Sequence, residues 1–106
     1  MDKKAIREAF RQSVFKRDGF QCAMCGRSDV KLDAHHINDR HDMPNGGYVA
    51  ENGITLCDCE QGCHWKAEHH HATGRSYPGY SPEELYAKIN SDFEKAWTAS
   101  ENLMEI

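Results

Sequence analysis

The sequence predicts a small α+β domain in which short strands and helices are held together by a zinc ion. Its 106 residues suit a single domain, and a domain of this size buries a limited core, so a bound metal is a common stabilising device. The chain also contains five cysteines and seven histidines. An odd cysteine count is unusual for a secreted disulfide scaffold, and cysteines close to histidines in a reducing compartment indicate metal binding.

A helix is expected over residues 2–16, at the start of the chain. Basic side chains fill the positions between its apolar residues, which recur at roughly helical spacing at Ala5, Phe10, Val14 and Phe15. Gly19 follows shortly after, where a glycine typically ends a helix.

Two short strands are expected in the middle of the chain. Residues 31–37 alternate enough for the first strand, and residues 54–56 form the second, preceded by an Asn52-Gly53 turn signal. Residues 38–48, which include Pro44, Asn45, Gly46 and Gly47, are expected to be a loop.

Two further helices are expected after the strands. The first starts near residue 63 and runs to about 71, and the second spans residues 82–102 after a loop at 72–80. Ser81 and Glu84 form a capping box at the start of the second helix. Its apolar residues lie at every fourth position, at Leu85, Ile89, Phe93 and Trp97. Such a stripe predicts packing rather than chemistry.

The charge is unevenly distributed along the chain. The formal net charge is −4, which argues mildly against a nucleic-acid partner. Residues 1–31, however, carry eight basic and four acidic side chains, so this part could meet phosphates while the acidic end stays outside. Solvated helix faces with no partner explain the same numbers. No segment has the length and apolarity of a membrane span or a signal peptide, so we expect an intracellular protein without a membrane partner.

The cysteines have the spacing of a structural zinc site. Cys22-x-x-Cys25 is followed by Gly26, and two thiolates at this spacing can reach one tetrahedral zinc ion, although a redox pair shares the pattern. The second pair is expected to be Cys57, at the end of a strand, and Cys63, at the start of a helix whose dipole favours a thiolate. Cys59 is then a spare or a rival ligand.

Between and around these cysteines the sequence resembles the HNH endonucleases, from Arg17 to about Glu68. The resemblance rests on Cys22-x-x-Cys25-Gly26, Ala34-His35-His36-Ile37, Gly46-Gly47, Glu51-Asn52-Gly53-Ile54-Thr55-Leu56-Cys57 and Cys63-His64-Trp65-Lys66. It implies a treble-clef-like, zinc-held ββα-metal core over residues 18–72, with flanking helices at 1–17 and 81–102 in one domain over 1–106. This chain has five residues between the last two zinc cysteines, where the family usually has two.

The resemblance also implies roles for individual residues. His36 matches the general base, and a histidine suits that role at neutral pH. His35 and His64 match the ligands of a catalytic divalent metal such as Mg²⁺, Mn²⁺, Ni²⁺ or Zn²⁺, and Glu68 is a further candidate ligand. Asn52 looks like the residue that orients the base through its carbonyl. The run His69-His70-His71 points in three directions on a helix, and we expect it to be a solvated helix end.

The neighbouring histidines make a specific structural prediction. On a regular strand, His35 and His36 point to opposite faces, and His36 would share a buried face with Ala34. Both rings act around one phosphate if the resemblance holds. Regular strand pairing is therefore expected to break down between Ala34 and Ile37.

The function implied by the resemblance is metal-dependent endonucleolytic hydrolysis of DNA in a bacterial or phage-type protein. One alternative is a non-catalytic, zinc-stabilised DNA-binding module, and another is a nuclease that is active only with a recruiting partner protein. A single active site implies a nick unless the chain forms a homodimer, and RNA remains open as a substrate. Arg40 and Lys66 either contact the nucleic-acid backbone or are solvated.

Overall fold

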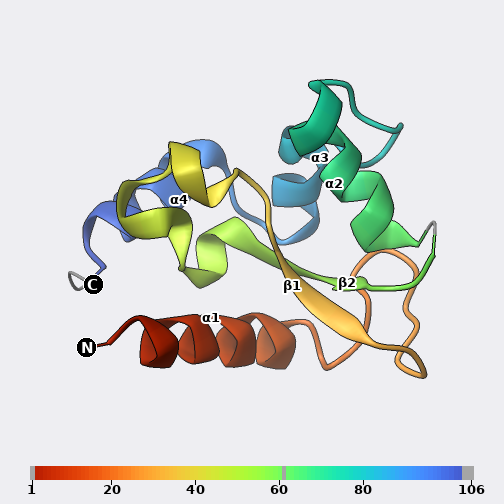
Figure 1. Cartoon of the computed structure of the whole chain (residues 1–106), viewed down its shortest axis with the longest axis horizontal. Helices are drawn as coiled ribbons and strands as arrows, with labels where there is room; N and C mark the ends of the chain where they lie inside the picture. Colours follow the sequence, from red (N-terminus) through yellow and green to blue (C-terminus); the bar gives the residue numbers. More distant parts are fainter. Residues whose placement is uncertain (1, 61, 104–106) are drawn as a thin grey trace.

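The two strands pair antiparallel at the centre of the chain, and helices cover the pair on both sides (Figure 1). This computed structural model describes residues 2–60 and 62–103, so the outermost residues of the expected domain, 1 and 104–106, lie outside it. The helices and strands are α1 (Lys3–Arg17), β1 (Leu32–His36), β2 (Gly53–Cys57), α2 (Cys63–Thr73), α3 (Pro82–Lys88) and α4 (Phe93–Glu101). The described residues thus form a small α+β fold with four α-helices and one two-stranded sheet.

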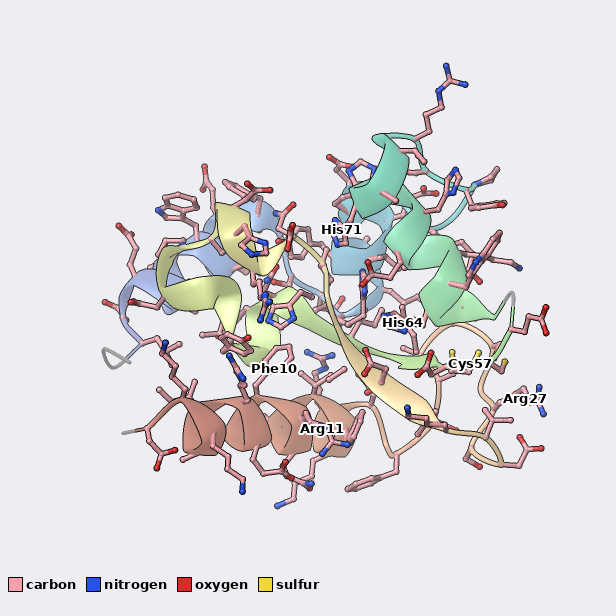
Figure 2. All side chains as sticks on the ribbon, in the orientation of Figure 1. Phe10, Arg11, Arg27, Cys57, His64 and His71 are labelled. Carbon is pink, nitrogen blue, oxygen red and sulfur yellow. The ribbon has the colours of Figure 1, made fainter. Side chains whose placement is uncertain are left out.

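Helix α1 lies along one face of the strand pair (Figure 1). It begins after Asp2, whose carboxylate accepts a hydrogen bond from the Ala5 N–H (2.7 Å), close to the predicted start. Phe10 points from α1 toward the strands (Figure 2). Beyond the helix end, the Asp18 carboxylate accepts a hydrogen bond from the Thr55 N–H (2.9 Å). This bond ties the end of α1 to β2.

Strand β1 stays paired with β2 to its last residue. His36 lies opposite Gly53, and the Ile37 N–H continues the ladder by donating to the Asn52 carbonyl oxygen (2.9 Å). The predicted loss of regular pairing at this end of the strand is therefore wrong. Regular pairing can be kept because helices cover both faces of the strand. The His35 ring contacts α2, and the His36 ring contacts α1.

The segment between the strands contains three 3₁₀ helices, at Arg40–Asp42, Pro44–Gly47 and Ala50–Asn52. The predicted turn at Asn52-Gly53 is wrong, because Gly53 is extended (φ −128°) and already belongs to β2. A Cβ atom on Gly53 would lie 2.6 Å from Cγ2 of Val14 and 2.7 Å from Cε1 of Phe10. Glycine at this position therefore allows α1 to approach β2 closely.

The C-terminal region forms two helices where the sequence predicted one. The capping box is confirmed, since the Ser81 hydroxyl accepts from the Glu84 N–H (3.2 Å) and the Glu84 carboxylate accepts from the Ser81 N–H (3.3 Å). The helix then ends before Asn90, which has a left-handed φ of 56°, and Asp92 caps a new helix. The predicted apolar stripe is broken as a result: Leu85 is buried, but Phe93 and Trp97 are 49% and 38% exposed.

The core lies on both sides of the strand pair. Phe10, Val14, Phe15 and Ala34 fill the space between α1 and the sheet. A larger cluster that includes Ile54, Leu56 and Leu85 joins β2 to α2 and α3. None of the described helices is both long and apolar enough to cross a membrane.

Candidate functional site

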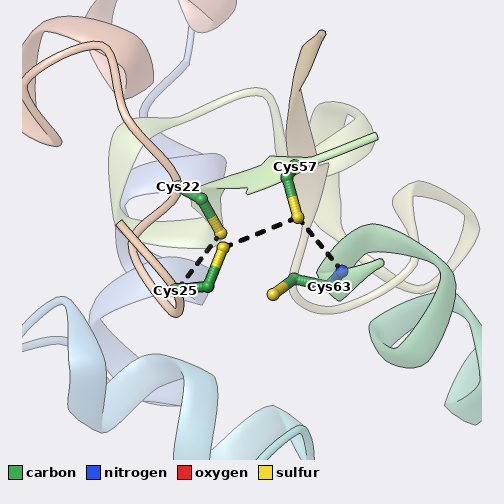
Figure 3. Close-up of side chains that lie close together, drawn as sticks. All are labelled: Cys22, Cys25, Cys57 and Cys63. Atoms are coloured by element: carbon green, nitrogen blue, oxygen red, sulfur yellow. Dashed lines mark hydrogen bonds between the residues drawn. The ribbon is translucent and has the colours of Figure 1, made fainter. Parts of the chain in front are cut away.

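Four cysteines from three separate segments meet at one end of β2 (Figure 3). They are Cys22 and Cys25 on the loop after α1, Cys57 at the end of β2 and Cys63 at the start of α2. All four sulfur atoms lie within 4.8 Å of one another, and the Sγ atoms of Cys25 and Cys57 are 3.8 Å apart. Sulfur atoms that bind one tetrahedral zinc at about 2.3 Å are themselves about 3.8 Å apart. These four cysteines could therefore hold a zinc ion.

Backbone hydrogen bonds prepare the cysteines for this role. The Cys25 N–H donates to Sγ of Cys22 (3.5 Å), and the Cys63 N–H donates to Sγ of Cys57 (3.3 Å). Burial opposes ionisation of Cys22, but backbone N–H groups outweigh it and lower the pKa of this thiol to about 7. Burial raises the pKa of Cys63. A metal that binds all four thiolates must therefore displace protons, so its affinity depends on pH.

Cys59 lies outside this cluster, although the sequence left it as a rival ligand. The Gly62 N–H donates to the Cys59 carbonyl oxygen (2.9 Å). A Cβ atom on Gly62 would lie 2.7 Å from Sγ of Cys59 and 3.2 Å from Sγ of Cys57. Only glycine fits at position 62 without displacing these sulfur atoms. Cys57 and Cys63, with five residues between them, are the second pair of the cluster.

A second group of candidate metal ligands lies between β1 and α2. It consists of His35, Glu68 and His71, whose donor atoms all lie within 4.8 Å of one another. The His35 and His71 rings are stacked, with centroids 5.2 Å apart. Figure 2 shows His64 and His71 on the side of α2 that is turned toward the strands. The set combines two imidazoles and one carboxylate, a combination that suits several divalent metals.

His35 is the buried centre of this group. Its side chain is only 1% exposed, and neither ring nitrogen has a hydrogen-bond partner among the described residues. The Glu68 carboxylate lies 3.3 Å from Nδ1 but is not aligned as a hydrogen bond. Burial lowers the pKa of His35, and Glu68 opposes this shift. A buried imidazole without partners is costly, and a metal ligated by it would remove that cost.

His64 lies at the edge of the group rather than inside it. Its Nε2 atom is 3.3 Å from both Glu68 and Asp33, and its Nδ1 atom is 3.2 Å from Asp58. Glu68 first, and then Asp33 and Asp58, raise the pKa of His64 to about 9 against the effect of burial. The His35 and His64 rings are still close, with centroids 5.4 Å apart.

His71 is the candidate ligand that the sequence interpretation missed. We expected a solvated helix end at residues 69–71, but the His71 ring stacks on His35 and its Nε2 donates to the His36 carbonyl oxygen (3.1 Å). His71 follows His64 by seven residues and Glu68 by three, so the three lie on one face of α2. That spacing was the available signal.

His36 occupies the opposite face of β1, against α1. Its ring stacks on Phe10 at a centroid distance of 4.6 Å and meets the edge of Tyr48 at 4.7 Å. Its Nε2 atom is buried and has no hydrogen-bond partner among the described residues. Burial first, and then the nearby His35 and Arg40, lower the pKa of His36 to about 4. The ring is therefore neutral at pH 7.

Asn52 is fully buried, but none of its hydrogen bonds goes to the His36 ring. Its side-chain oxygen accepts from the Asn38 N–H (3.0 Å) and the Tyr86 hydroxyl (2.7 Å), and its amide donates to the carbonyl oxygens of Asn38 and Gly47. Its backbone carbonyl accepts from Ile37. The expectation that a carbonyl of Asn52 orients the base directly is therefore corrected: Asn52 fixes the backbone that leaves β1.

One cavity of about 330 Å³ connects the two faces at the end of β1. Its lining includes the candidate ligands His35, Glu68 and His71, the flanking His64 and the candidate base His36. Arg40 and Tyr48 also line it. The structure thus brings His35, His36, His64 and Glu68 together around one space, whose lining does not include Asn52.

The depressed pKa of His36 predicts how stability depends on pH. His36 titrates at about 4 in the folded chain and near 6.5 in the unfolded chain. Below pH 6.5 the unfolded chain binds more protons, so the free energy of unfolding falls as the pH drops toward 4. Between pH 7 and pH 5 we expect His36 to account for a loss of about 2 kcal/mol. Urea unfolding at pH 7 and pH 5 measures the loss of unfolding free energy, and His36→Gln should lack the part that His36 contributes. Equal losses in His36→Gln and in the natural sequence would contradict the assignment of this loss to His36.

Comparison with family models, curated proteins and solved structures found no match to this chain. A function must therefore be inferred from the chemistry of the site itself.

Proposed function

We propose that this chain is a metal-dependent endonuclease that hydrolyses phosphodiester bonds in DNA. The observation that carries the proposal is the cavity at the end of β1. It places a buried, unpartnered imidazole with two further ligand side chains on one side and a neutral histidine on the other. Hydrolysis of a phosphodiester needs a base and a metal ion, because water must lose a proton while negative charge accumulates on the phosphate.

The ligand set fits a divalent metal. His35 and His71 offer imidazole nitrogens and Glu68 a carboxylate, which leaves coordination positions for water and substrate. The buried nitrogens of His35 have no other partner among the described residues. A divalent ion bound there would relieve negative charge on the phosphate and on the leaving 3′ oxygen.

The remaining residues of the cavity have separate roles. His36 takes the proton from the attacking water, and its stacking on Phe10 and its T-shaped contact with Tyr48 hold the ring in place. Arg40 lines the same cavity and supplies positive charge near the phosphate. By the resemblance to HNH endonucleases, the expected products carry a 5′ phosphate and a 3′ hydroxyl.

The zinc site supports this chemistry from outside the cavity. Cys57 ends β2 and Cys63 begins α2, so a zinc held by both would fix α2 against the sheet. His35 comes from the sheet, whereas Glu68 and His71 come from α2. The distance from His35 to Glu68 and His71 therefore depends on how firmly α2 is held against the sheet.

The experiment that tests the proposal is cleavage of supercoiled plasmid by the zinc-loaded chain with Mg²⁺ or Mn²⁺. We expect conversion to the nicked form only when a divalent metal is added, with 5′ phosphate and 3′ hydroxyl ends. DNA binding without cleavage under any metal would replace the proposal with a non-catalytic binding module. Cleavage that appears only with a cell extract would indicate a recruiting partner protein.

His71 is the sharpest test of the ligand set. We expect His71→Ala to weaken Mn²⁺ binding to the zinc-loaded chain by more than about 100-fold, because even residues that support a metal ligand usually contribute 10- to 100-fold. Titration calorimetry measures this. His69→Ala is the matched control, since the His69 ring packs instead against Trp65 and Tyr77. Equal binding by both variants would remove His71 from the set.

A further inference from the structure

A second cavity, of about 260 Å³, lies between the start of α1 and the segment that follows β1. Its lining includes the basic side chains Lys3, Arg7, Arg40 and His41, together with Tyr48. No carboxylate lines it among the described residues. We call it the basic groove. In Figure 1 the first turns of α1 lie beneath the segment that forms its other wall.

The positive charges of the basic groove are not neutralised within the described part of the chain. Lys3, Arg7 and Arg40 are exposed and form no ion pair there, whereas His41 lies 3.3 Å from Asp39. Arginines elsewhere do have carboxylate partners, in the pairs Arg11–Glu8, Arg17–Asp18 and Arg27–Asp29. Three uncompensated cations around one hollow strongly attract anions.

The basic groove lies next to the proposed active site, and the two cavities share part of their lining. Arg40 and Tyr48 line both cavities. The Tyr48 hydroxyl accepts a hydrogen bond from Arg40 (3.4 Å), its ring lies 5.9 Å from the Arg7 guanidinium, and its edge meets the candidate base His36. An anion in the groove therefore sits beside the place where the scissile phosphate would lie.

We infer that the basic groove binds the phosphates that adjoin the cleaved one on the same DNA strand. The inference rests on the proposed function for the nature of the ligand. A nucleic-acid strand carries a phosphate at every nucleotide, so a strand held at the active site extends its neighbouring phosphates into the groove. Lys3 and Arg7 then hold the strand in register without reading its sequence.

The test compares two double variants that remove the same charge. Lys3→Gln/Arg7→Gln lies in the groove, and Lys4→Gln/Lys16→Gln lies on α1 outside the lining. Binding of each zinc-loaded protein to a labelled duplex is measured by fluorescence anisotropy over a series of NaCl concentrations, without added divalent metal so that no cleavage occurs. Zinc content and circular dichroism confirm that each variant is folded.

We expect the groove variant to flatten the slope of log affinity against log salt by about 2, and the control variant to keep the slope of the natural sequence. Equal slopes for the two variants would overturn the inference. So would displacement of the duplex by inorganic phosphate beyond the effect of NaCl at equal ionic strength, because that marks a pocket for a free anion.

The outcomes separate this inference from the proposed function. If DNA binding depends on Lys3 and Arg7 but the protein never cleaves plasmid, the inference about the basic groove holds and the proposed nuclease function is wrong. If the protein cleaves plasmid with a divalent metal but the groove variant binds the duplex as the natural sequence does, the nuclease function holds and the inference about the basic groove is wrong.

Discussion

Replacing Cys57 by serine is expected to leave the chain largely unfolded at room temperature. Structural zinc sites contribute about 10–16 kcal/mol of binding free energy in small zinc-finger peptides, which equals or exceeds the roughly 5–15 kcal/mol by which domains are stable. Here the only sheet described has two strands, which are marginal without support. Cys57 is 3% exposed and joins the end of β2 to Cys25 and Cys63. Its sulfur therefore connects three segments.

Cys59→Ser is the matched control for this prediction. It removes a thiol two residues away that lies outside the four-cysteine cluster. We expect one zinc per chain and an unchanged thermal midpoint in Cys59→Ser, but no bound zinc and no cooperative transition in Cys57→Ser. Elemental analysis and circular dichroism give both readings. A folded, zinc-loaded Cys57→Ser, or loss of zinc in Cys59→Ser, contradicts the assigned ligands.

Local signals predicted the elements whose causes are local. The helix α1, the capping box of Ser81 and Glu84 and the C-x-x-C turn each depend on residues that lie close together in the sequence. The position of Cys63 at the first residue of α2 was also predictable, and with it the second pair of the four-cysteine cluster.

Features that depend on distant contacts were not predictable in this way. The partners of Asn52 include Tyr86, which is 34 residues away, so its role behind β1 could not be read from its neighbours. The break before α4 escaped detection because the apolar spacing continues across it from Leu85 to Trp97. His71 was missed because the periodicity of a helix gives relative directions only, and the face of α2 that meets β1 is fixed by the fold.

The adjacent histidines show how a correct pattern can lead to a wrong structural prediction. A regular strand was expected to bury His36 on the face that it shares with Ala34, so a break in pairing was predicted. The strand is regular, and the cavity at its end reaches both rings. His35 meets it from the side of α2 and His36 from the side of α1.

The loss of His36 should reduce catalysis most strongly while leaving the fold intact. General-base catalysis typically contributes 10²- to 10⁴-fold, so we expect His36→Ala to cleave plasmid more slowly by about that factor. The side chain lies on Phe10 and Tyr48, outside both groups of candidate metal ligands. Zinc content and Mn²⁺ affinity should therefore match the natural sequence, which distinguishes a lost base from a lost metal.

The central claim is that His36 and the His35–Glu68–His71 group act together on one phosphodiester bond. Its most direct test is the initial rate of Mn²⁺-dependent plasmid nicking by the natural sequence and by His36→Ala, with both proteins zinc-loaded and saturated with Mn²⁺. We predict a rate for His36→Ala that is lower by about 10²- to 10⁴-fold. Equal rates for the two proteins would contradict the claim.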